Sequence, residues 1–582
     1  MRIPTLCILS SLALAACDPD PGIDFTADTI DQGWNNSDRL LFWHMPQGSY
    51  VVPYDWFLAL ENTTGKRITD RLGDMGYLPG AFHEELNPNT LPIGFTVERP
   101  TDTHRAVFGF QENWLGLTCS ACHVGAIEVG DKTVIIDGGA AQGDMQTLVF
   151  AISDDLHATL NDGERFVAFA ARLGIEDADQ QVALRAKVEG FLQQFDGYKN
   201  RSFHDVDGSA TNPGPGRVDA FGVILNEVSS FATGIAANKQ TPTAPVSYPF
   251  VWGSPRLDWV QYNGVSQNAF TRNIGEVLGV FGRIQMDPRN QDTYLASTVR
   301  FDELQKIEST LRKLKEPSWE LVFGEKPKET VRGEELYNLH CEGCHLREPV
   351  LVPNQFGGEF EKVVLVDLPF IKTDSQFIQN LGARGEADMG VFAGASPLRL
   401  AEGVFDRLLF VNDTVRQTAL AIFGQSPPLP ARTNSSRLLG LTTLALALKY
   451  IADTGVSVGS PGFFDITNRA GFEPPPHPTK YKARDLSGIW ATGPYLHNGS
   501  VRTLADMLKP CAEREKTFRI GSFKYDKDGL GFVSDGPFVF DTAVRGNSNC
   551  GHESAADDER DIFGTKLSDA DRAELLEFLK SL

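Results

Sequence analysis

The chain has 582 residues, which is too many for one compact core and predicts roughly two to four domains. Hydrophobic residues make up 41% and charged residues 22%, an ordinary globular composition that excludes a fibrous or disordered protein. The net charge of −22 at pH 7 excludes a general nucleic-acid binder, because phosphate groups require a basic face, and it favours either a basic soluble partner or a well-solvated acidic surface.

The N-terminal segment predicts export. Arg2 is followed by an apolar run over residues 6–16, which is too short to span a membrane but suits the core of a signal peptide. The L-A-A-C sequence that ends at Cys17 resembles a bacterial lipobox. This resemblance implies a lipoprotein signal peptide over residues 1–16, a lipid on the Cys17 thiol and a linker over residues 17–35; an ordinary signal-cleavage site beside a cysteine is the alternative. We therefore expect a periplasmic protein held at a bacterial membrane by its lipid anchor only.

Two C-x-x-C-H motifs carry the chemistry. Their spacing presents two thiols for thioether bonds to one porphyrin, and the histidine that follows supplies an axial nitrogen to the iron. A thioredoxin-like pair requires a βαβ context that neither motif has, and a zinc site requires four ligands from paired motifs, which here lie far apart. We therefore expect two covalently bound c-type haems. Their residues are Cys119, Cys122 and His123 for haem 1, and Cys341, Cys344 and His345 for haem 2.

The cysteines outside the haem motifs predict a disulfide bond. Cys7 lies in the signal peptide and Cys17 takes the lipid, which leaves Cys511 and Cys550. Because an exported compartment is oxidising, we expect these two thiols to pair.

Helical patterns accompany the second motif. Thr330 is a suitable N-cap for a helix directly before the motif, and Ser568 caps a second pattern with an acidic first turn and an apolar stripe. This arrangement resembles small c-type cytochromes, which carry a helix before the motif and end on a helix packed across it. Charged patterns over residues 177–193 and 303–315 predict surface helices.

The fold class that follows is mostly α. One haem motif in each half, with a break in the helical pattern between Pro317 and Pro327, predicts two cytochrome c-like haem domains. Long loops and insertions enlarge each of them, as the stretches rich in glycine and proline indicate. We place the N-terminal domain with haem 1 at residues 36–320 and the C-terminal domain with haem 2 at residues 321–582.

The segment from Tyr481 to Val501, which contains T-G-P-Y-L-H-N-G-S, carries a family resemblance. It is similar to the second domain of bacterial di-haem cytochrome c peroxidases, whose superfamily includes the methylamine-dehydrogenase maturation enzyme and the rubber-cleaving di-haem oxygenases. The long loops and the G-N-S-N-C-G-H-E sequence over residues 546–553 resemble the rubber-oxygenase branch most. The resemblance implies an oxidoreductase in which haem 2 passes electrons, while the haem on His123 keeps an open face where peroxide or dioxygen reacts.

The resemblance also implies a sixth ligand for the second iron, and three residues compete for this role. Peroxidases place a methionine downstream of the shared segment, in a region where this chain has Cys511. A bridge from Cys511 to Cys550 would bring His552 to that place, so His552 is preferred, with His497 and Met507 as the alternatives. The expected iron ligands are then His123, His345 and His552.

The superfamily places a tryptophan between its haems. We expect Trp252 to take this role and to join His123 in the catalytic machinery, although burial in a core explains a tryptophan nearly as well. Phe270 and Phe281 suit an apolar pocket wall, but core packing is the simpler interpretation for both. His204, in a polar stretch, is a further candidate for the open face of haem 1.

The enzyme hypothesis implies partners and substrates as well. We expect a small periplasmic electron carrier as partner and peroxide, dioxygen or an apolar organic compound as substrate, and a calcium ion is a further candidate cofactor. A non-catalytic electron-transfer lipoprotein is the alternative. The length of the chain favours the enzyme, because two bare cytochrome units need far fewer residues.

Overall fold

The computed structural model of the chain describes residues 28–203, 210–266, 269–287, 289–290, 292–353, 359–383, 387–388, 432–433, 435–454, 479–552 and 567–582. The expected signal peptide, Cys17 and His204 lie outside these residues, so the lipid anchor stays a prediction. Within the described part of the chain, none of the helices has both the length and the apolar character needed to cross a membrane.

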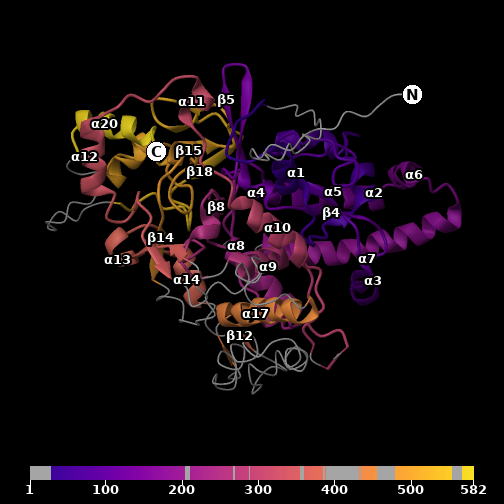
Figure 1. Ribbon diagram of the computed structural model, residues 1–582. Helices are drawn as coiled ribbons and strands as arrows, with labels where there is room; N and C mark the ends of the chain where they lie inside the picture. The colour runs from indigo at the N-terminus through magenta and orange to yellow at the C-terminus, as the bar shows by residue number, and fades with distance from the viewer. Residues whose placement is uncertain are drawn as a thin grey trace, which may run out of the picture.

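Helices and short strands alternate along the chain (Figure 1). The α-helices are α1 (Asn36–His44), α2 (Tyr54–Ala59), α3 (Asp102–Phe108), α4 (Ser120–His123), α5 (Met145–Asn161), α6 (Gly163–Arg172), α7 (Ala178–Ser202), α8 (Ala220–Asn226), α9 (Ala269–Gly279), α10 (Phe301–Leu311), α11 (Trp319–Phe323), α12 (Val331–His340), α13 (Leu368–Ile371), α14 (Gln376–Ala383), α17 (Ser435–Thr454), α19 (Leu504–Met507) and α20 (Asp569–Leu579). The strands are β1 (Asp28–Thr29), β2 (Val52–Pro53), β3 (Phe95–Glu98), β4 (Trp114–Leu117), β5 (Val124–Val129), β6 (Lys132–Asp137), β7 (Arg217–Val218), β8 (Val246–Ser247), β9 (Leu351–Pro353), β10 (Glu359–Glu361), β11 (Val364–Asp367), β12 (Ala387–Asp388), β13 (Arg432–Thr433), β14 (Lys480–Ala483), β15 (Thr517–Ile520), β16 (Tyr525–Asp526), β17 (Gly531–Phe532) and β18 (Phe538–Asp541).

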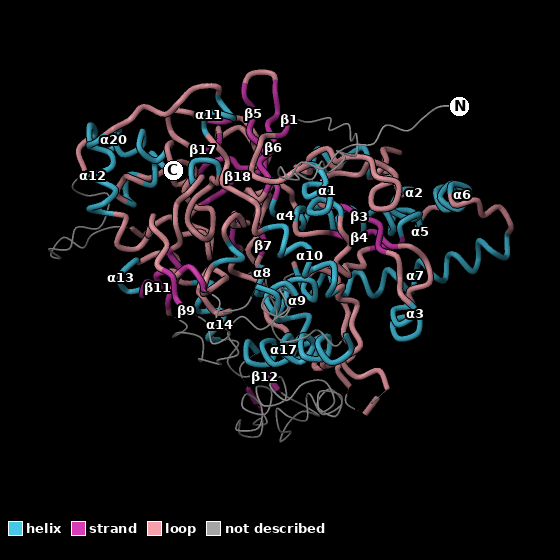
Figure 2. The backbone as a smooth tube through the Cα atoms, in the orientation of Figure 1, coloured by secondary structure: helices cyan, strands magenta, loops and turns pink. Residues whose placement is uncertain are grey.

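The fold is mixed α/β, and the expected mostly α fold with two cytochrome c-like haem domains is wrong. Helix accounts for 41% of the described residues and strand for 15%. The strands form many small sheets, which Figure 2 shows scattered among long loops. Apart from β5 and β6, the strands have only two to four residues, which is too few for a periodicity that distinguishes a strand from loop, and for this reason they were not predicted. The division into residues 36–320 and 321–582 stays a prediction.

Two three-stranded sheets flank the first motif. One has the strand order β2-β4-β3 and the other the order β1-β6-β5. The C-x-x-C-H residues form the single turn α4 between the end of β4 and the start of β5. Strands β5 and β6 pair as an antiparallel hairpin over a two-residue turn, where Gly130 takes the left-handed conformation (φ 65°) that glycine accepts without strain. Both cysteines and the histidine are therefore held by sheet on either side.

A helix pair holds the second motif. Thr330 caps α12 and Ser568 caps α20, as predicted from the sequence. The two helices pack closely at Gly333, where a Cβ atom would lie 2.3 Å from the backbone oxygen of Glu574, and the two elements lie side by side in Figure 1. The predicted surface helices are also present, as α7 and α10.

One large hydrophobic core joins the two halves of the chain. It combines Trp43 and Ile136 with Trp490 and Leu575, each of which is buried. A second core lies within residues 51–281. The two motifs are consequently built on one continuous interior.

A buried carboxylate organises the N-terminal side of this core. Asp137, at the end of β6, accepts hydrogen bonds from Trp34 Nε1 (3.1 Å), Trp43 Nε1 (2.7 Å) and Arg39 Nε (2.7 Å). Its main chain exchanges two further hydrogen bonds with the side chain of Gln32. Asp137 is 1% and Arg39 is 4% exposed, so this ion pair is almost fully removed from water.

We predict that Asp137→Asn lowers the free energy of unfolding by about 3–5 kcal/mol, because it removes one partner of a buried ion pair, the carboxylate that accepts from the Arg39 guanidinium. Urea denaturation followed by tryptophan fluorescence measures this loss. The matched control is Asp131→Asn in the exposed turn of the same hairpin, which we expect to change stability by no more than about 0.5 kcal/mol. Equal stability of the two variants would contradict the assignment.

Candidate haem-binding cavity

The first motif presents a histidine in one defined tautomer. His123 Nδ1 lies 2.7 Å from the backbone oxygen of Pro249. Because a carbonyl oxygen only accepts hydrogen bonds, Nδ1 carries the hydrogen and Nε2 keeps its lone pair. Desolvation lowers the pKa of His123 to about 4, and the bond to Pro249 opposes this shift. The imidazole is therefore neutral at pH 7, as a metal ligand must be.

The second motif repeats this arrangement. His345 Nδ1 lies 2.6 Å from the backbone oxygen of Arg484, so its Nε2 also keeps a lone pair. Desolvation lowers the pKa of His345, and the bond to Arg484 opposes the shift. The Tyr337 hydroxyl donates to the backbone oxygen of His345 (2.7 Å), which ties the motif to helix α12.

One cavity of about 840 Å³ reaches both motifs. Its wall contains apolar side chains from both halves of the chain, among them Phe42, Leu117, Phe221 and Leu504. The motif residues in its lining are Cys119, Cys122, His123, Cys341, Cys344 and His345. A large apolar cavity with thiols and a neutral imidazole at each end is the environment that covalently bound haems require.

His552 is the residue that the structure places opposite His345. Their ring centroids lie 6.4 Å apart and the ring planes differ by 17°. Two imidazoles that bind one metal ion from opposite sides at about 2 Å each have centroids roughly 6 Å apart. The centroid separation of His345 and His552 is therefore compatible with one iron ion between the two rings.

His497 and Met507 also line the cavity. The ring of His497 packs against Tyr481 with 4.5 Å between centroids, and its Nε2 lies 3.2 Å from the Tyr481 hydroxyl. Because that hydroxyl donates its hydrogen to the backbone oxygen of Asp374 (2.8 Å), His497 Nε2 donates to the tyrosine oxygen. Met507 lies at the end of α19. Of the three candidates, only His552 has a ring contact with His345 among the described residues.

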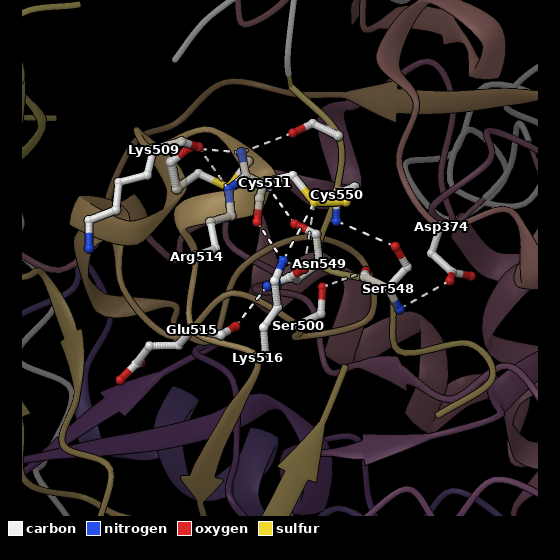
Figure 3. The surroundings of a disulfide bond; sticks show 12 residues. Asp374, Ser500, Lys509, Cys511, Arg514, Glu515, Lys516, Ser548, Asn549 and Cys550 are labelled. Atoms are coloured by element: carbon white, nitrogen blue, oxygen red, sulfur yellow. Dashed lines mark hydrogen bonds between the residues drawn. A yellow bond between two sulfur atoms is a disulfide. The ribbon is translucent and has the colours of Figure 1, made fainter. Parts of the chain in front are cut away.

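The loop that carries His552 is fixed by the predicted disulfide bond. Cys511 and Cys550 are bonded, with 4.9 Å between their Cα atoms, so this prediction is confirmed (Figure 3). Beside the bridge, the buried Arg514 guanidinium donates to the backbone oxygens of Asn549 (2.6 Å) and Gly551 (3.0 Å). Sequence reasoning missed Arg514, because its partners are backbone oxygens and no motif identifies it.

Gly551 brings this loop against the neighbouring chain. Its φ is 114°, and a Cβ atom there would lie 2.8 Å from the Cα atom of Thr373. The next residue, His552, has φ 59° and donates its backbone N–H to the oxygen of Ile371 (3.0 Å). The left-handed conformation is uncommon for histidine, so the surrounding contacts must hold the ring in its position.

A buried polar cluster that the sequence did not reveal lines the cavity beside the first motif. Arg272 and Asn273 on α9 both donate to Glu308 Oε1 on α10, at 2.6 and 2.7 Å. Glu276, one turn after Arg272, lies 3.7 Å from its guanidinium. Burial raises the pKa of the Cys119 thiol to about 12, and the charge of Glu276 adds to this shift. Charged residues four apart on an otherwise apolar helix are the signal that could have indicated this cluster.

The remaining aromatic candidates lie in hydrophobic cores. Trp252 is 2% exposed, stacks on Phe250 with 4.6 Å between centroids and donates to the backbone oxygen of Ser487 (2.8 Å). Trp252 packs against Phe250, which lines the cavity. The role of Trp252 between the haems stays a prediction. Phe270 packs against Phe301, and Phe281 stacks on Tyr198, which confirms core packing for both phenylalanines. His204 lies outside the described residues.

The described residues do not support the expected calcium site. Among them, no group of three or more histidine, cysteine, aspartate or glutamate side chains is arranged to hold a metal ion.

Comparison with known proteins agrees with the motif chemistry. Residues 480–519 match the RoxA-like, cytochrome c-like family, which supports a c-type haem protein and indicates a haem-based oxidoreductase. The uncharacterized protein y4iJ of Sinorhizobium fredii is 30% identical over 610 residues, which cover 95% of this chain and 93% of that protein. A second uncharacterized protein of the same organism, y4iM, is 33% identical over 118 residues, which cover 17% of this chain and 27% of that protein.

We predict that the double variant C511S/C550S lowers the free energy of unfolding by roughly 3–4 kcal/mol, because the bridge closes a loop of about 40 residues in the unfolded chain. Thermal melting with and without reductant measures the effect. Reductant should lower the melting temperature of the natural chain and leave that of the double variant unchanged. Two thiols that react with an alkylating agent before reduction would contradict the bridge.

Proposed function

This chain belongs to the same family as the Sinorhizobium fredii protein y4iJ, and we propose that it is a c-type oxidoreductase with two covalent haems. Cys119 and Cys122 would bind haem 1 with His123 as axial ligand, and Cys341 and Cys344 would bind haem 2 with His345. When bound, the iron supplies the redox chemistry, and the protein supplies its ligands, orientation and electrostatic surroundings.

The observation that carries this proposal is the difference between the two motif histidines. His345 faces a second imidazole, that of His552, at the spacing of a bis-histidine site. The ring contact of His123 is instead with Tyr248, at 6.4 Å and an angle of 62°. Because two strong axial ligands exclude a substrate, haem 2 suits electron transfer, and haem 1 is the place where peroxide or dioxygen would react.

The polar cluster beside the first motif supports a reaction at haem 1. Oxygen chemistry consumes protons, and the wall of that part of the cavity contains the largely buried Glu308 and Arg272 and the partly exposed Glu276. Their charged and polar groups can orient a polar substrate beside the first motif. A polar cluster in the cavity wall beside the first motif favours the enzyme over the non-catalytic electron-transfer lipoprotein.

The location and partner are part of the same proposal. The signal sequence and Cys17 support export and a lipid anchor in the periplasm, where c-type haems are attached and disulfide bonds persist. The acidic net charge of −22 supports a small basic electron carrier as partner. The substrate is peroxide, dioxygen or an organic compound that enters the apolar part of the cavity.

We predict that the purified protein carries two haem masses that survive denaturation. Mass spectrometry of the unfolded chain measures this, and replacing both Cys341 and Cys344 with alanine should remove one haem mass and leave the other. Carbon monoxide should bind the reduced natural protein at a single haem, and it should still bind this variant. One haem mass or none in the natural chain would refute the proposal, and low-spin spectra for both haems would favour the electron carrier.

We predict that His552→Ala adds a second high-spin ferric signal and leaves both haems attached, because it removes the imidazole opposite His345. His497→Ala is the matched control in the same cavity, and we expect it to alter stability or reduction potential while the second haem stays low-spin. Electron paramagnetic resonance of the two ferric variants distinguishes the outcomes. The reverse result, with an open iron only in the His497 variant, would make His497 the ligand.

A further inference from the structure

Arg484 occupies the junction between the two motifs. Its backbone oxygen accepts the hydrogen bond from His345 Nδ1, at 2.6 Å. Its guanidinium points the other way and donates to the backbone oxygens of Phe250 (2.9 Å) and Trp252. Arg484 thus supplies the hydrogen-bond acceptor of His345 and also binds the segment of residues 249–252.

That segment also contains the acceptor for the first motif histidine. The backbone oxygen bonded to His123 belongs to Pro249, which directly precedes Phe250. The chain from Pro249 to Trp252 is therefore fixed at one end by His123 and at the other by Arg484. The Arg484 guanidinium carbon also lies 3.8 Å from the centroid of the Phe250 ring, a cation–π contact that adds to the two hydrogen bonds.

The burial and the charge of Arg484 strengthen its hydrogen bonds to Phe250 and Trp252. The side chain of Arg484 is 11% exposed, and its nearest carboxylate is Asp485 at 3.8 Å. Burial lowers the pKa of Arg484 to about 10, so the guanidinium stays charged at pH 7. Hydrogen bonds from a charged donor are about twice as strong as those between neutral groups, and a planar guanidinium can hold two acceptors in a fixed geometry.

We infer that Arg484 is a positioning residue that couples the two haem sites. Its own carbonyl oxygen orients His345, and its guanidinium fixes the segment whose carbonyl oxygen, that of Pro249, orients His123. The bond at Nδ1 fixes the orientation of a ligating imidazole and sets its basicity, so a shift of either carbonyl changes the ligand field of the iron beyond it. A substitution at Arg484, which ligates neither iron, should therefore alter both haems together. The inference rests on the proposed two-haem function.

The test compares Arg484→Gln, Arg484→Lys and the control Arg256→Gln in the full-length, haem-loaded protein. Arg256 lies near the same segment, but its side chain is 45% exposed and pairs with Glu361. Mass spectrometry first establishes that two haems are attached. Electron paramagnetic resonance of the ferric protein and a redox titration then report on each haem separately.

We expect Arg484→Gln to change the ferric signals of both haems and to move each reduction equilibrium by about tenfold, which is about 59 mV for one electron. Arg484→Lys, which keeps the charge but not the planar pair of donors, should change the ferric signals of both haems to a smaller extent. The control should leave both haems as they are in the natural protein.

A response at only one haem, or none in either Arg484 variant, would overturn the inference. If Arg484→Gln fails to fold, Arg484→Lys alone tests the inference. A change at both haems then supports it, and a change at only one haem or at neither overturns it. Absence of the second haem mass in the natural protein would instead refute the proposed function, so the two failures remain distinct.

Discussion

The hydrogen bond from Nδ1 of each motif histidine to a backbone oxygen is the interaction on which the rest of the cavity depends. It places the hydrogen on Nδ1, leaves Nε2 free and fixes the plane of the ring, while burial keeps the imidazole neutral. The two acceptors come from segments far from their motifs in sequence, Pro249 for His123 and Arg484 for His345. Each motif can therefore act only after the chain between and beyond the motifs has folded around it.

Features that depend on local sequence were predicted well. The C-x-x-C-H residues, the caps of α12 and α20 at Thr330 and Ser568, and the charged helix α7 each follow from spacing or from side-chain chemistry within a few residues. The disulfide bond was predicted by a different route, because the other cysteines already had assigned roles. These predictions required no knowledge of how distant segments meet.

Several features that depend on tertiary contacts were not predicted. The hairpin of β5 and β6 has a recognisable sequence signal, the G-D turn between two β-branched runs. The short strands elsewhere have no such signal, and the predicted fold class was wrong as a result. Arg514 and Arg484 donate hydrogen bonds to backbone oxygens, and such contacts cannot be recognised from side-chain patterns in the sequence. The cluster of Arg272, Asn273 and Glu308 forms only because α9 and α10 meet beside the first motif.

The shared core has a consequence for how this protein can be studied and how it could have evolved. A fragment that ended near residue 320 would lack the part of this core that Trp490 and Leu575 contribute, and the apolar surface left uncovered would favour aggregation. Dissection into single-haem pieces would therefore yield insoluble material instead of two simpler cytochromes. For the same reason, a gene rearrangement that separated the halves would disrupt the shared core, which favours inheritance of the two motifs as a unit.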